Sequence, residues 1–205
     1  MLTKGLQTRQ EIVEASLQLF SVKGYFNTSI SDILQATGLT KGGLYGRFGS
    51  KEQIWDAAYE HSVQIWRGIV FEGVRKITHP VERIMRTLEN DLRNYIGGEV
   101  FRGGCFFFNM LVELSGQSEP MARRILDGYR AFSNLLASWI EEAREIGILR
   151  AEVDCREVAD FILTAVNGAA ALYAASRETA ILEITLQHFR LHLDCLSANF
   201  IGAYR

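Results

Sequence analysis

The segment SISDILQATGLTKGGLYGRF, residues 29–48, carries the start and stop signals of two short helices. Ser29 and Asp32 have the spacing of a capping box, in which each side chain binds the backbone N–H of the other residue. The apolar pattern that follows predicts a first short helix over residues 31–37.

A three-residue turn, Gly38-Leu39-Thr40, joins this helix to a second one that is predicted over residues 41–48. Gly38 suits the left-handed backbone that ends a helix, Leu39 can fill a small core, and Thr40 can cap the next helix. Two short helices joined in this way predict a helix-turn-helix. The second helix of such a motif enters the major groove of DNA with its N-terminal residues foremost.

The rest of the chain also has helical patterns. Strand patterns are nearly absent, and the apolar run at residues 105–108 continues into a pattern that favours a buried helix. Caps, prolines and glycines delimit about nine helices in total. Besides the motif, they cover residues 8–23 (with Thr8 and Glu11 as a capping box), 50–76 (with Ser50 and Gln53 as another), 80–96, 104–114, 119–145, 155–175 and 178–200.

We therefore predict an all-α fold with two domains. Residues 1–52 form a three-helix, N-terminal helix-turn-helix domain that binds DNA. Residues 53–205 form a larger helical domain that binds an effector and dimerises.

Composition narrows the class of protein. The chain has 205 residues, of which 48% are hydrophobic and 22% charged, ordinary proportions for a globular protein. No apolar run is expected to be long enough to cross a bilayer, and residues 1–5 lack the hydrophobic core of a signal peptide. Three widely spaced cysteines cannot all pair within one chain, so reduced thiols are expected. These features predict a cytoplasmic protein without membrane contact.

Charge is distributed unevenly along the chain. Residues 1–52 carry six Lys or Arg and four Asp or Glu, although the net charge of the whole chain is −2. A basic end on an acidic body is compatible with nucleic-acid binding by that end. Many ordinary domains show such an asymmetry, so it adds little by itself.

The first quarter of the chain resembles the TetR family of transcriptional regulators. The matching residues are 8–12 (TRQEI), 19–25 (LFSVKGY), 28–33 (TSISDI), 38–42 (GLTKG) and 44–52 (LYGRFGSKE). Residues 104–121 are similar, more weakly, to one subgroup of that family. The resemblance implies a homodimer, a palindromic operator in double-stranded DNA, and repression that a ligand relieves. The family pattern usually has Thr in place of Gly43 and His in place of Arg47, so the operator sequence cannot be carried over.

The chemistry of the motif fits DNA binding independently. Hydroxyls, basic side chains and free N–H groups at helix starts are donors to phosphates and base edges. Glycines weaken a helix by about 1 kcal/mol each, and close approach of the backbone to DNA is a reason to keep them. The predicted DNA-binding residues are Thr28, Ser29, Thr40, Lys41, Gly42, Gly43, Tyr45, Arg47 and Lys51. The alternatives are a purely structural three-helix bundle and, for Tyr45 alone, a packing role.

Aromatic residues concentrate after residue 55, which is compatible with an apolar ligand pocket that holds a few polar groups. Asn109 and Glu113 share one helix face and could supply such groups. The predicted ligand-binding residues are Trp66, Tyr95, Cys105, Phe107, Asn109, Glu113, Tyr129 and Phe132, and the expected effector is an apolar or aromatic small molecule. The alternative is that most of these aromatic residues only fill the core.

The helix predicted over residues 155–175 is apolar on nearly every side, so it must be buried on two sides. Together with the last helix it suits a four-helix interface between two copies of the chain. The predicted dimer residues are Phe161, Val166, Ala169, Leu172, Phe189 and Leu193. The alternative is burial within one chain.

Cys105 is expected at a helix N-terminus, where the helix dipole lowers a thiol pKa, so a redox or electrophile sensor is an alternative function. A small buried apolar side chain is the other interpretation of this residue. His188 and His192 are four residues apart but lack a matched third ligand, so no metal site is predicted. No cofactor motif and no catalytic motif is found, and the protein is predicted not to be an enzyme.

These patterns together predict a ligand-responsive, DNA-binding repressor. Effector binding would tilt the helix over residues 50–76 and so change the spacing of the two recognition helices in the dimer. The alternative to this function is a DNA-binding activator or nucleoid-type protein that responds to no effector.

Overall fold

The structure is a computed structural model that describes residues 4–199. It contains α1 (Lys4–Lys23), α2 (Ile30–Thr37), α3 (Lys41–Tyr45), α4 (Lys51–Val70), the 3₁₀ turn η1 (Val74–Lys76), α5 (Pro80–Glu89), the π-helical segment η2 (Asn90–Ile96), α6 (Phe106–Leu114), α7 (Glu119–Glu145), α8 (Cys155–Ser176) and α9 (Thr179–Cys195). Within the described residues the β-type pairing is an isolated bridge between Leu149 and Ser197. The predicted all-α fold with nine α-helices is thereby confirmed for this range.

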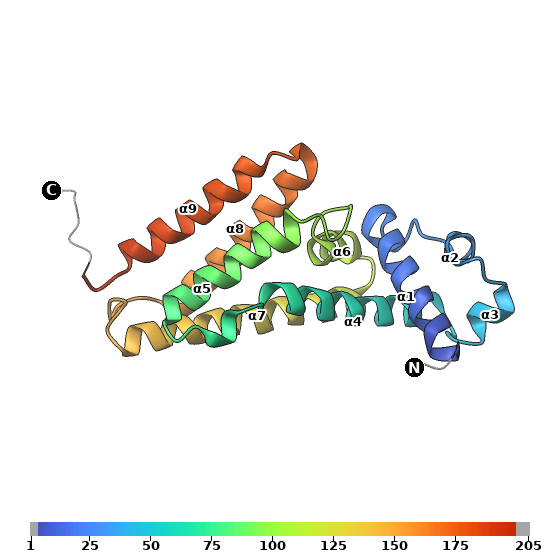
Figure 1. Cartoon of the computed structure of the whole chain (residues 1–205), viewed down its shortest axis with the longest axis horizontal. Helices are drawn as coiled ribbons and strands as arrows, with labels where there is room; N and C mark the ends of the chain where they lie inside the picture. Colours follow the sequence, from blue (N-terminus) through green and yellow to red (C-terminus); the bar gives the residue numbers. More distant parts are fainter. Residues whose placement is uncertain (1–3, 200–205) are drawn as a thin grey trace.

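The molecule is elongated, with a small group of helices at one end (Figure 1). This head consists of α1, α2 and α3, and the body consists of the helices from α4 onward. The helices α4 and α7 run lengthwise along the body, and α8 and α9 form a neighbouring pair (Figure 1). The helix α1 packs along α4 and thus joins the head to the body.

The local signals in the head produce the predicted caps. Ser29 Oγ accepts a hydrogen bond from Asp32 N at 3.1 Å, and Asp32 Oδ2 accepts one from Ser29 N at 2.7 Å, which completes the capping box. Gly38 has φ of 67° and ends α2 in the left-handed conformation. Thr40 Oγ1 accepts a hydrogen bond from Gly43 N at 3.2 Å and caps α3.

Some predicted helix limits are wrong. The first helix begins by Lys4, so Thr8 and Glu11 lie inside α1 and do not form its N-terminal capping box. The helix α3 ends at Tyr45 rather than at residue 48, because glycines weaken its short run and the chain turns at Gly46. At the start of α4, Ser50 caps Gln53 as expected, but the Gln53 side chain accepts from Gly49 N instead of closing the box.

Further along, three predicted helices are divided or shortened. The helix predicted over residues 50–76 ends at Val70, and η1 follows after Gly73 turns the backbone at φ 73°. The helix predicted over residues 80–96 changes from α to π geometry after Glu89. The last helix ends at Cys195, and residue 200, where it was expected to end, lies outside the described residues.

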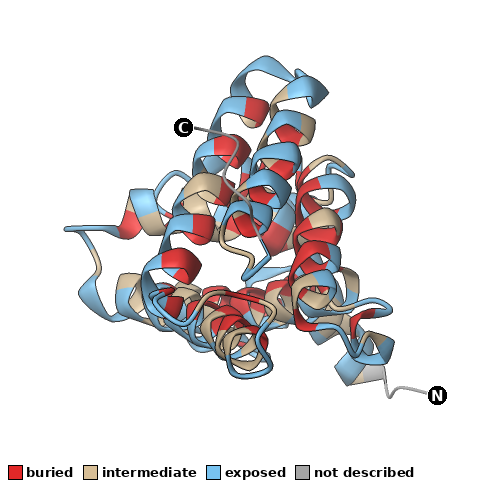
Figure 2. Cartoon of the chain, turned by 90° about the vertical axis from the view of Figure 1, so that its left-hand side faces the viewer, coloured by how far each residue is buried: buried red, intermediate tan, exposed pale blue. Residues whose placement is uncertain are grey.

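Buried side chains form one hydrophobic core that extends from Ile12 in the head to Leu193 in α9. Figure 2 shows these buried positions on the inward sides of the body helices. Trp55, Phe20 and Phe106 are the largest fully buried side chains, and they lie on α4, α1 and α6. Packing in this core continues across residue 52. The predicted domain boundary at that residue therefore does not coincide with a gap in the core, and it stays a prediction.

The helix α8 is long and apolar enough to cross a membrane by length and composition alone. The prediction that no segment reaches that length is therefore wrong for Cys155–Ser176. However, 44% of its most apolar window is buried inside the chain, where it packs on α7 and α9. A core helix has this composition because it is buried on two sides.

Candidate DNA-binding surface and internal cavity

Seven of the nine predicted DNA-binding residues lie exposed on the head, on α3, beside the starts of α2 and α3, and just after the end of α3. Tyr45 is 50% exposed although it is a large aromatic residue. The seven are Ser29, Thr40, Lys41, Gly42, Gly43, Tyr45 and Arg47. The sequence motif therefore places hydroxyl and basic donors together on one accessible short helix and its flanks.

Packing within the chain does not require the first glycine of α3. A Cβ atom built at Gly42 would meet nothing within 4 Å, and one at Gly43 would make ordinary contacts of 3.5 Å or longer. The cost of glycine in a helix therefore has no internal compensation at Gly42. The bare backbone at Gly42 is compatible with close approach of DNA, which stays a prediction.

The structure corrects the placement of Thr28. Its side chain is completely buried, and Thr28 Oγ1 donates a hydrogen bond to Gly24 O at 2.6 Å. This hydroxyl therefore closes the turn between α1 and α2 and is not available to DNA, contrary to the prediction.

The ammonium group of Lys51 also has internal partners. Lys51 Nζ donates to Tyr25 O at 2.8 Å and to Thr28 O at 2.9 Å, and it lies 4.2 Å from the centre of the Tyr25 ring. Partial burial lowers the pKa of Lys51. Lys51 thus ties the start of α4 to the turn before α2, a structural role that the sequence did not suggest.

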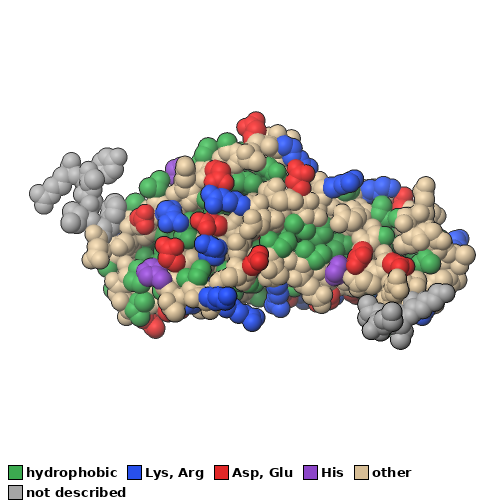
Figure 3. Space-filling view, in the orientation of Figure 1, with side chains coloured by type: hydrophobic (Ala, Val, Ile, Leu, Met, Phe, Trp, Pro, Cys, Tyr) green, Lys and Arg blue, Asp and Glu red, His purple; other side chains and the backbone are tan. Residues whose placement is uncertain are grey.

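The body holds the same turn from the other side. Glu113 on α6 accepts hydrogen bonds from Tyr25 N at 2.8 Å and from Phe26 N at 2.9 Å. The fit is close, because a Cβ at Gly24 would lie 2.5 Å from Glu113 Oε1 and one at Gly103 would lie 1.8 Å from Ser21 O. Figure 3 shows a patch of apolar side chains on this face, near the place where α6 meets the head. The joint between head and body is therefore made of direct, short contacts.

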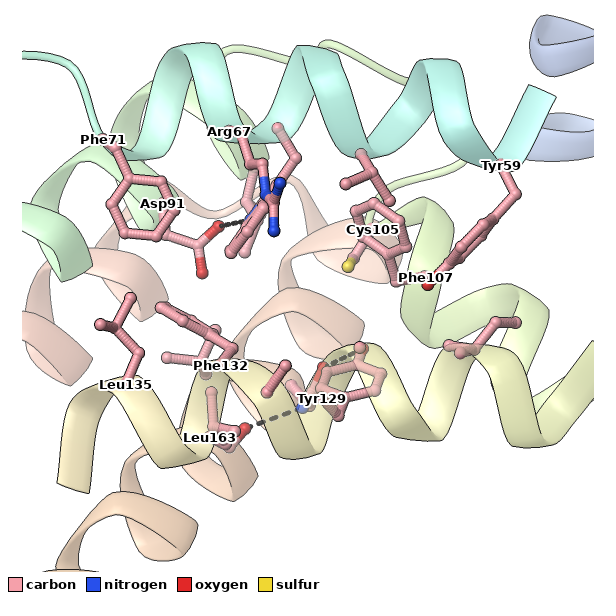
Figure 4. Close-up of a pocket in the computed structure, with 18 of the residues that line it drawn as sticks. Tyr59, Arg67, Phe71, Asp91, Cys105, Phe107, Tyr129, Phe132, Leu135 and Leu163 are labelled. Carbon is pink, nitrogen blue, oxygen red and sulfur yellow. Dashed lines mark hydrogen bonds between the residues drawn. The ribbon is translucent and has the colours of Figure 1, made fainter. Parts of the chain in front are cut away.

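A cavity of about 370 Å³ lies inside the body between α4, η2, α6, α7 and α8 (Figure 4). Five predicted ligand-binding residues contribute to its wall, namely Trp66, Cys105, Phe107, Tyr129 and Phe132. Other parts of the wall are formed by Tyr59, Glu60, Val63, Arg67, Phe71, Asp91, Ile96, Ile125, Gly128, Ala131, Leu135, Leu163, Val166 and Asn167.

Three predicted ligand-binding residues do not line this cavity, and their placement is corrected. Tyr95 is buried behind the wall, with its ring stacked 6.4 Å from that of Phe107. Asn109 Nδ2 donates to Gly103 O at 2.6 Å and so stabilises the loop before α6. Glu113 faces the head, as described above. Asn109 and Glu113 follow the cavity-lining Phe107 on the same helix, and a sequence cannot tell which face of α6 points inward.

Asp91 is a buried polar wall residue that sequence reasoning missed. It is 4% exposed, and its carboxyl accepts a hydrogen bond from Trp66 Nε1 at 3.1 Å (Figure 4). Burial raises the pKa of Asp91 to about 7, and the bond from Trp66 opposes part of this rise. The sequence did contain a signal that Asp91 faces the interior. Asp91 follows Leu88 by three residues and precedes Tyr95 by four, and this helical spacing puts it on the apolar face of its helix.

A second polar pair lies across the cavity. Tyr129 OH donates a hydrogen bond to Asn167 Oδ1 at 2.8 Å, which joins α7 to α8. Burial raises the pKa of Tyr129 far above its usual range, so its hydroxyl stays protonated. The cavity therefore offers hydroxyl, amide and carboxyl groups on a wall that is otherwise mainly aromatic and aliphatic.

The structure does not support the alternative in which the Cys105 thiol is activated. Cys105 lies at the N-cap of α6, but burial raises the pKa of its thiol to about 12. Desolvation outweighs the favourable backbone N–H groups of Phe108 and Phe107. A thiol that stays protonated is a poor nucleophile, so this geometry does not support a sensor based on Cys105.

Four of the six predicted dimer residues are buried within the chain, namely Val166, Ala169, Phe189 and Leu193. The other two, Phe161 and Leu172, are exposed. Phe161 also lines a surface groove between α8 and α9 with Ala165, Ile184, Thr185, His188, Phe189, Leu191, His192 and Cys195. The two helices are thus apolar on both sides, and the sequence pattern could not separate the inner from the outer face.

His188 and His192 of this groove lack a third metal ligand among the described residues. Among residues 4–199 no three His, Cys, Asp or Glu side chains are arranged to hold a metal ion. The His192 ring instead lies 5.3 Å from that of Phe161, centre to centre.

Comparison with known proteins covers both the head and the body. A family model described as bacterial regulatory proteins, tetR family, matches residues 12–58, and one described as tetracyclin repressor-like, C-terminal domain, matches residues 80–189. The chain is 28% identical over 189 residues to the HTH-type transcriptional repressor DhaR of Mycobacterium sp. (strain GP1), with 91% of this chain and 86% of that protein covered. It is 25% identical over 180 residues to the HTH-type transcriptional regulator LmrA of Bacillus subtilis (strain 168), with 87% and 93% covered.

Solved structures show the same architecture. A TetR transcriptional regulator from Chloroflexus aurantiacus J-10-FL superposes with a TM-score of 0.89 and 29% identity, covering 96% of this chain and 98% of that one. A TetR-family regulator from Cytophaga hutchinsonii superposes with a TM-score of 0.86 and 23% identity, covering 98% and 100%. The similarity extends over the head, the cavity-bearing body and the pair α8–α9 together.

Proposed function

The chain belongs to the TetR family of DNA-binding transcriptional regulators, and on this premise we propose that it is a homodimeric repressor which a small apolar or aromatic effector releases from a palindromic operator. It is a regulator of transcription and not an enzyme. Because such a protein acts on the bacterial chromosome, we place it in the cytoplasm.

The observation that carries the proposal is that α4 and α6 each reach both the cavity and the head. On α4, Trp66 lines the cavity and Lys51 binds the turn at Tyr25. On α6, Phe107 lines the cavity and Glu113 binds the same turn. A ligand that displaces either wall helix would therefore move the head.

Movement of the head matters because a dimer reads two half-sites at a fixed separation. Half-sites lie about one helical turn of DNA, ~34–36 Å, or a multiple of it apart. A small rotation of each head changes the distance between the two α3 helices. Operator affinity then falls without any loss of folding, which is coupling between two distinct sites.

The dimer is supported by the apolar surface of α8 and α9. Phe161 is 51% exposed and Leu191 is 57% exposed, and both lie along the groove between these helices. Two such surfaces related by a twofold axis would bury each other in a four-helix arrangement.

The test begins with selection of bound sequences from random DNA, followed by footprinting. We expect a palindromic footprint and a stoichiometry of two chains per site. The double variant Lys41→Ala, Tyr45→Phe should lose this binding, whereas the matched control Lys76→Ala, an exposed lysine of the body, should keep it. A footprint over a single half-site would contradict the dimeric repressor.

The effector response has its own readout. Compounds that raise the melting temperature of the free protein should also release labelled operator. Filling the cavity by Leu163→Trp, at a buried residue of its wall, should abolish both effects and leave operator binding in place. If compounds bind and raise the melting temperature but never change operator affinity, the regulator responds to no effector and this part of the proposal fails.

A further inference from the structure

Asp91 is a buried carboxyl group in the cavity wall that lacks a cationic partner among the described residues. It is 4% exposed, and among the described residues it accepts a single side-chain hydrogen bond, from Trp66 Nε1. A carboxylate accepts up to four hydrogen bonds, so most of its capacity is unused. Burial of such a group is costly unless a donor or a positive charge compensates it.

Three aromatic rings surround this end of the cavity. Trp66 and Phe132 have ring centres 4.9 Å apart, Trp66 and Phe71 5.5 Å, and Phe71 and Phe132 6.2 Å, all in edge-to-face geometry. Figure 4 shows the Asp91 carboxyl beside the Phe71 ring and above Phe132. Aromatic faces attract organic cations, and the attraction is strongest where water is excluded.

We propose that the effector is an apolar organic cation, a quaternary ammonium or protonated amine with an aromatic or aliphatic body, whose positive charge lies between Asp91 and the ring cluster of Trp66, Phe71 and Phe132. The proposal rests on the ligand response described above and specifies its chemistry. The cavity of about 370 Å³ is within the size range of small-molecule sites, and its remaining wall is apolar enough to receive the body of such a ligand.

Several other ionisable groups lie in the cavity wall or near Asp91. Arg67 and Glu60 of α4 line the cavity but are exposed, and Glu60 pairs with Arg124. The remaining ionisable neighbours are Tyr95 of η2, Cys105 before α6 and Tyr129 of α7, whose raised pKa values keep them uncharged. On the outer side of η2, Arg93 pairs with Glu183 of α9, and Glu89 of α5 pairs with Arg86 and Arg190 at the surface. Among the described residues of the cavity wall, Arg67 is the cationic side chain, and it would favour an anionic ligand instead.

Asp91 is also linked to the end of α4 through the neighbouring residue Asn90. Its neighbour Asn90 donates hydrogen bonds from Nδ2 to Val70 O at 3.1 Å and to Glu72 O at 3.0 Å, at the end of α4. Both residues lie in the π-helical segment η2, and such segments are frequent at functional sites. A cation bound at Asp91 would therefore shift η2, the segment that is hydrogen-bonded to the C-terminal end of α4.

The test compares three probes of matched shape by calorimetry. Benzyltrimethylammonium carries a permanent charge, 2,2-dimethylpropylbenzene is its neutral isostere, and phenylmethanesulfonate is an anion of similar size. We expect the cation to bind at least ten-fold more tightly than the neutral isostere and to release labelled operator. Asp91→Asn keeps an acceptor for Trp66 Nε1. It should lower the affinity for the cation at least ten-fold and change the affinity for the neutral probe less than two-fold.

The matched control is Glu157→Gln, which removes the same charge at an exposed position of α8 and should leave all three affinities unchanged. Between pH 6 and pH 8 the affinity of the wild-type protein for the cation should rise about ten-fold, because Asp91 ionises over this range. The same series with Asp91→Asn should be flat.

Three outcomes overturn the inference. If the anion binds best, Arg67 selects the effector, and if only the neutral isostere binds and releases DNA, the ligand response stands without a charged effector. Failure of the cation to bind overturns the inference in any case. Loss of ligand response altogether would be recognised separately, because no compound that binds would then change operator affinity.

Discussion

Glu113 Oε2 lies 2.8 Å from the backbone nitrogen of Tyr25, a residue 88 positions earlier in the chain. The second carboxyl oxygen accepts from Phe26 N at 2.9 Å. One side chain of the body therefore holds two adjacent amides of the head. Since α6 also carries the cavity residue Phe107, this contact lies between the proposed effector site and the DNA-binding surface.

Replacement of Glu113 by alanine should loosen the head from the body. Two backbone N–H groups lose their acceptor, and we expect the free energy of unfolding to fall by about 1–3 kcal/mol. Operator affinity should fall as well, and effector binding should no longer change it. Chemical denaturation and operator titration with and without effector measure these effects. Val112→Ala, at an exposed position on the same helix, is the control, and an unaltered effector response in Glu113→Ala would count against the coupling.

Lys51 and Tyr45 are expected to have different roles: Lys51 stabilises the fold, whereas Tyr45 contacts DNA. Lys51→Met removes the donor to Tyr25 O and Thr28 O, so we expect the free energy of unfolding to fall by about 1–3 kcal/mol. Tyr45→Phe removes an exposed hydroxyl and should change it by less than about 0.5 kcal/mol. Operator affinity, in contrast, should fall in Tyr45→Phe. A Lys51→Met protein of wild-type stability with weakened DNA binding would reverse this assignment.

Lys41 is exposed at the start of α3 and is expected to contact a phosphate. Lys41→Ala should weaken binding to specific and random DNA alike, and the slope of log K against log salt should become smaller by about 1. Titrations at several salt concentrations measure the slope. The body variant Lys76→Ala is the control, and equal slopes in all three proteins would remove Lys41 from the interface.

Asp91 should make stability depend on pH. Its pKa is about 7 in the folded chain and lower when unfolded, so the folded state holds the proton more tightly. This contribution to stability is fully present below the unfolded pKa of about 4 and is lost as pH rises to about 7, by as much as ~4 kcal/mol. Asp91→Asn should remove this slope and be more stable than the wild type at pH 8. Parallel pH profiles for the two proteins would show that Asp91 does not titrate as described.

The apolar surface of α8 and α9 predicts the assembly. Leu191→Glu places a charge on the groove, where the wild-type side chain is 57% exposed, so the monomer should fold normally. We expect sedimentation to show a monomer with weak operator binding. Ile146→Glu, at an equally exposed apolar residue at the end of α7, should remain dimeric. If both variants sediment as the wild type does, the dimer forms elsewhere.

Local signals in the sequence determined much of the head. The Ser29–Asp32 capping box, the left-handed Gly38 and the Thr40 cap depend on atoms within four residues of one another, so their formation follows from residue order alone. For the same reason the all-α class and the starts of several body helices were predictable. The ends of α3, α4, α5 and α9 differ from the prediction, because tertiary contacts and glycines decide how far a helix continues.

Tertiary structure alone decided which face of each helix points where. The pattern showed that α8 and α9 are apolar but did not distinguish Val166, which is buried in the chain, from Phe161, which is exposed. The burial that raises the pKa values of Cys105 and Asp91, and the link from Glu113 to Tyr25, arise between segments brought together from distant parts of the chain. Desolvation and long-range hydrogen bonds depend on the neighbours that folding supplies, and no pattern within a single helix contains them.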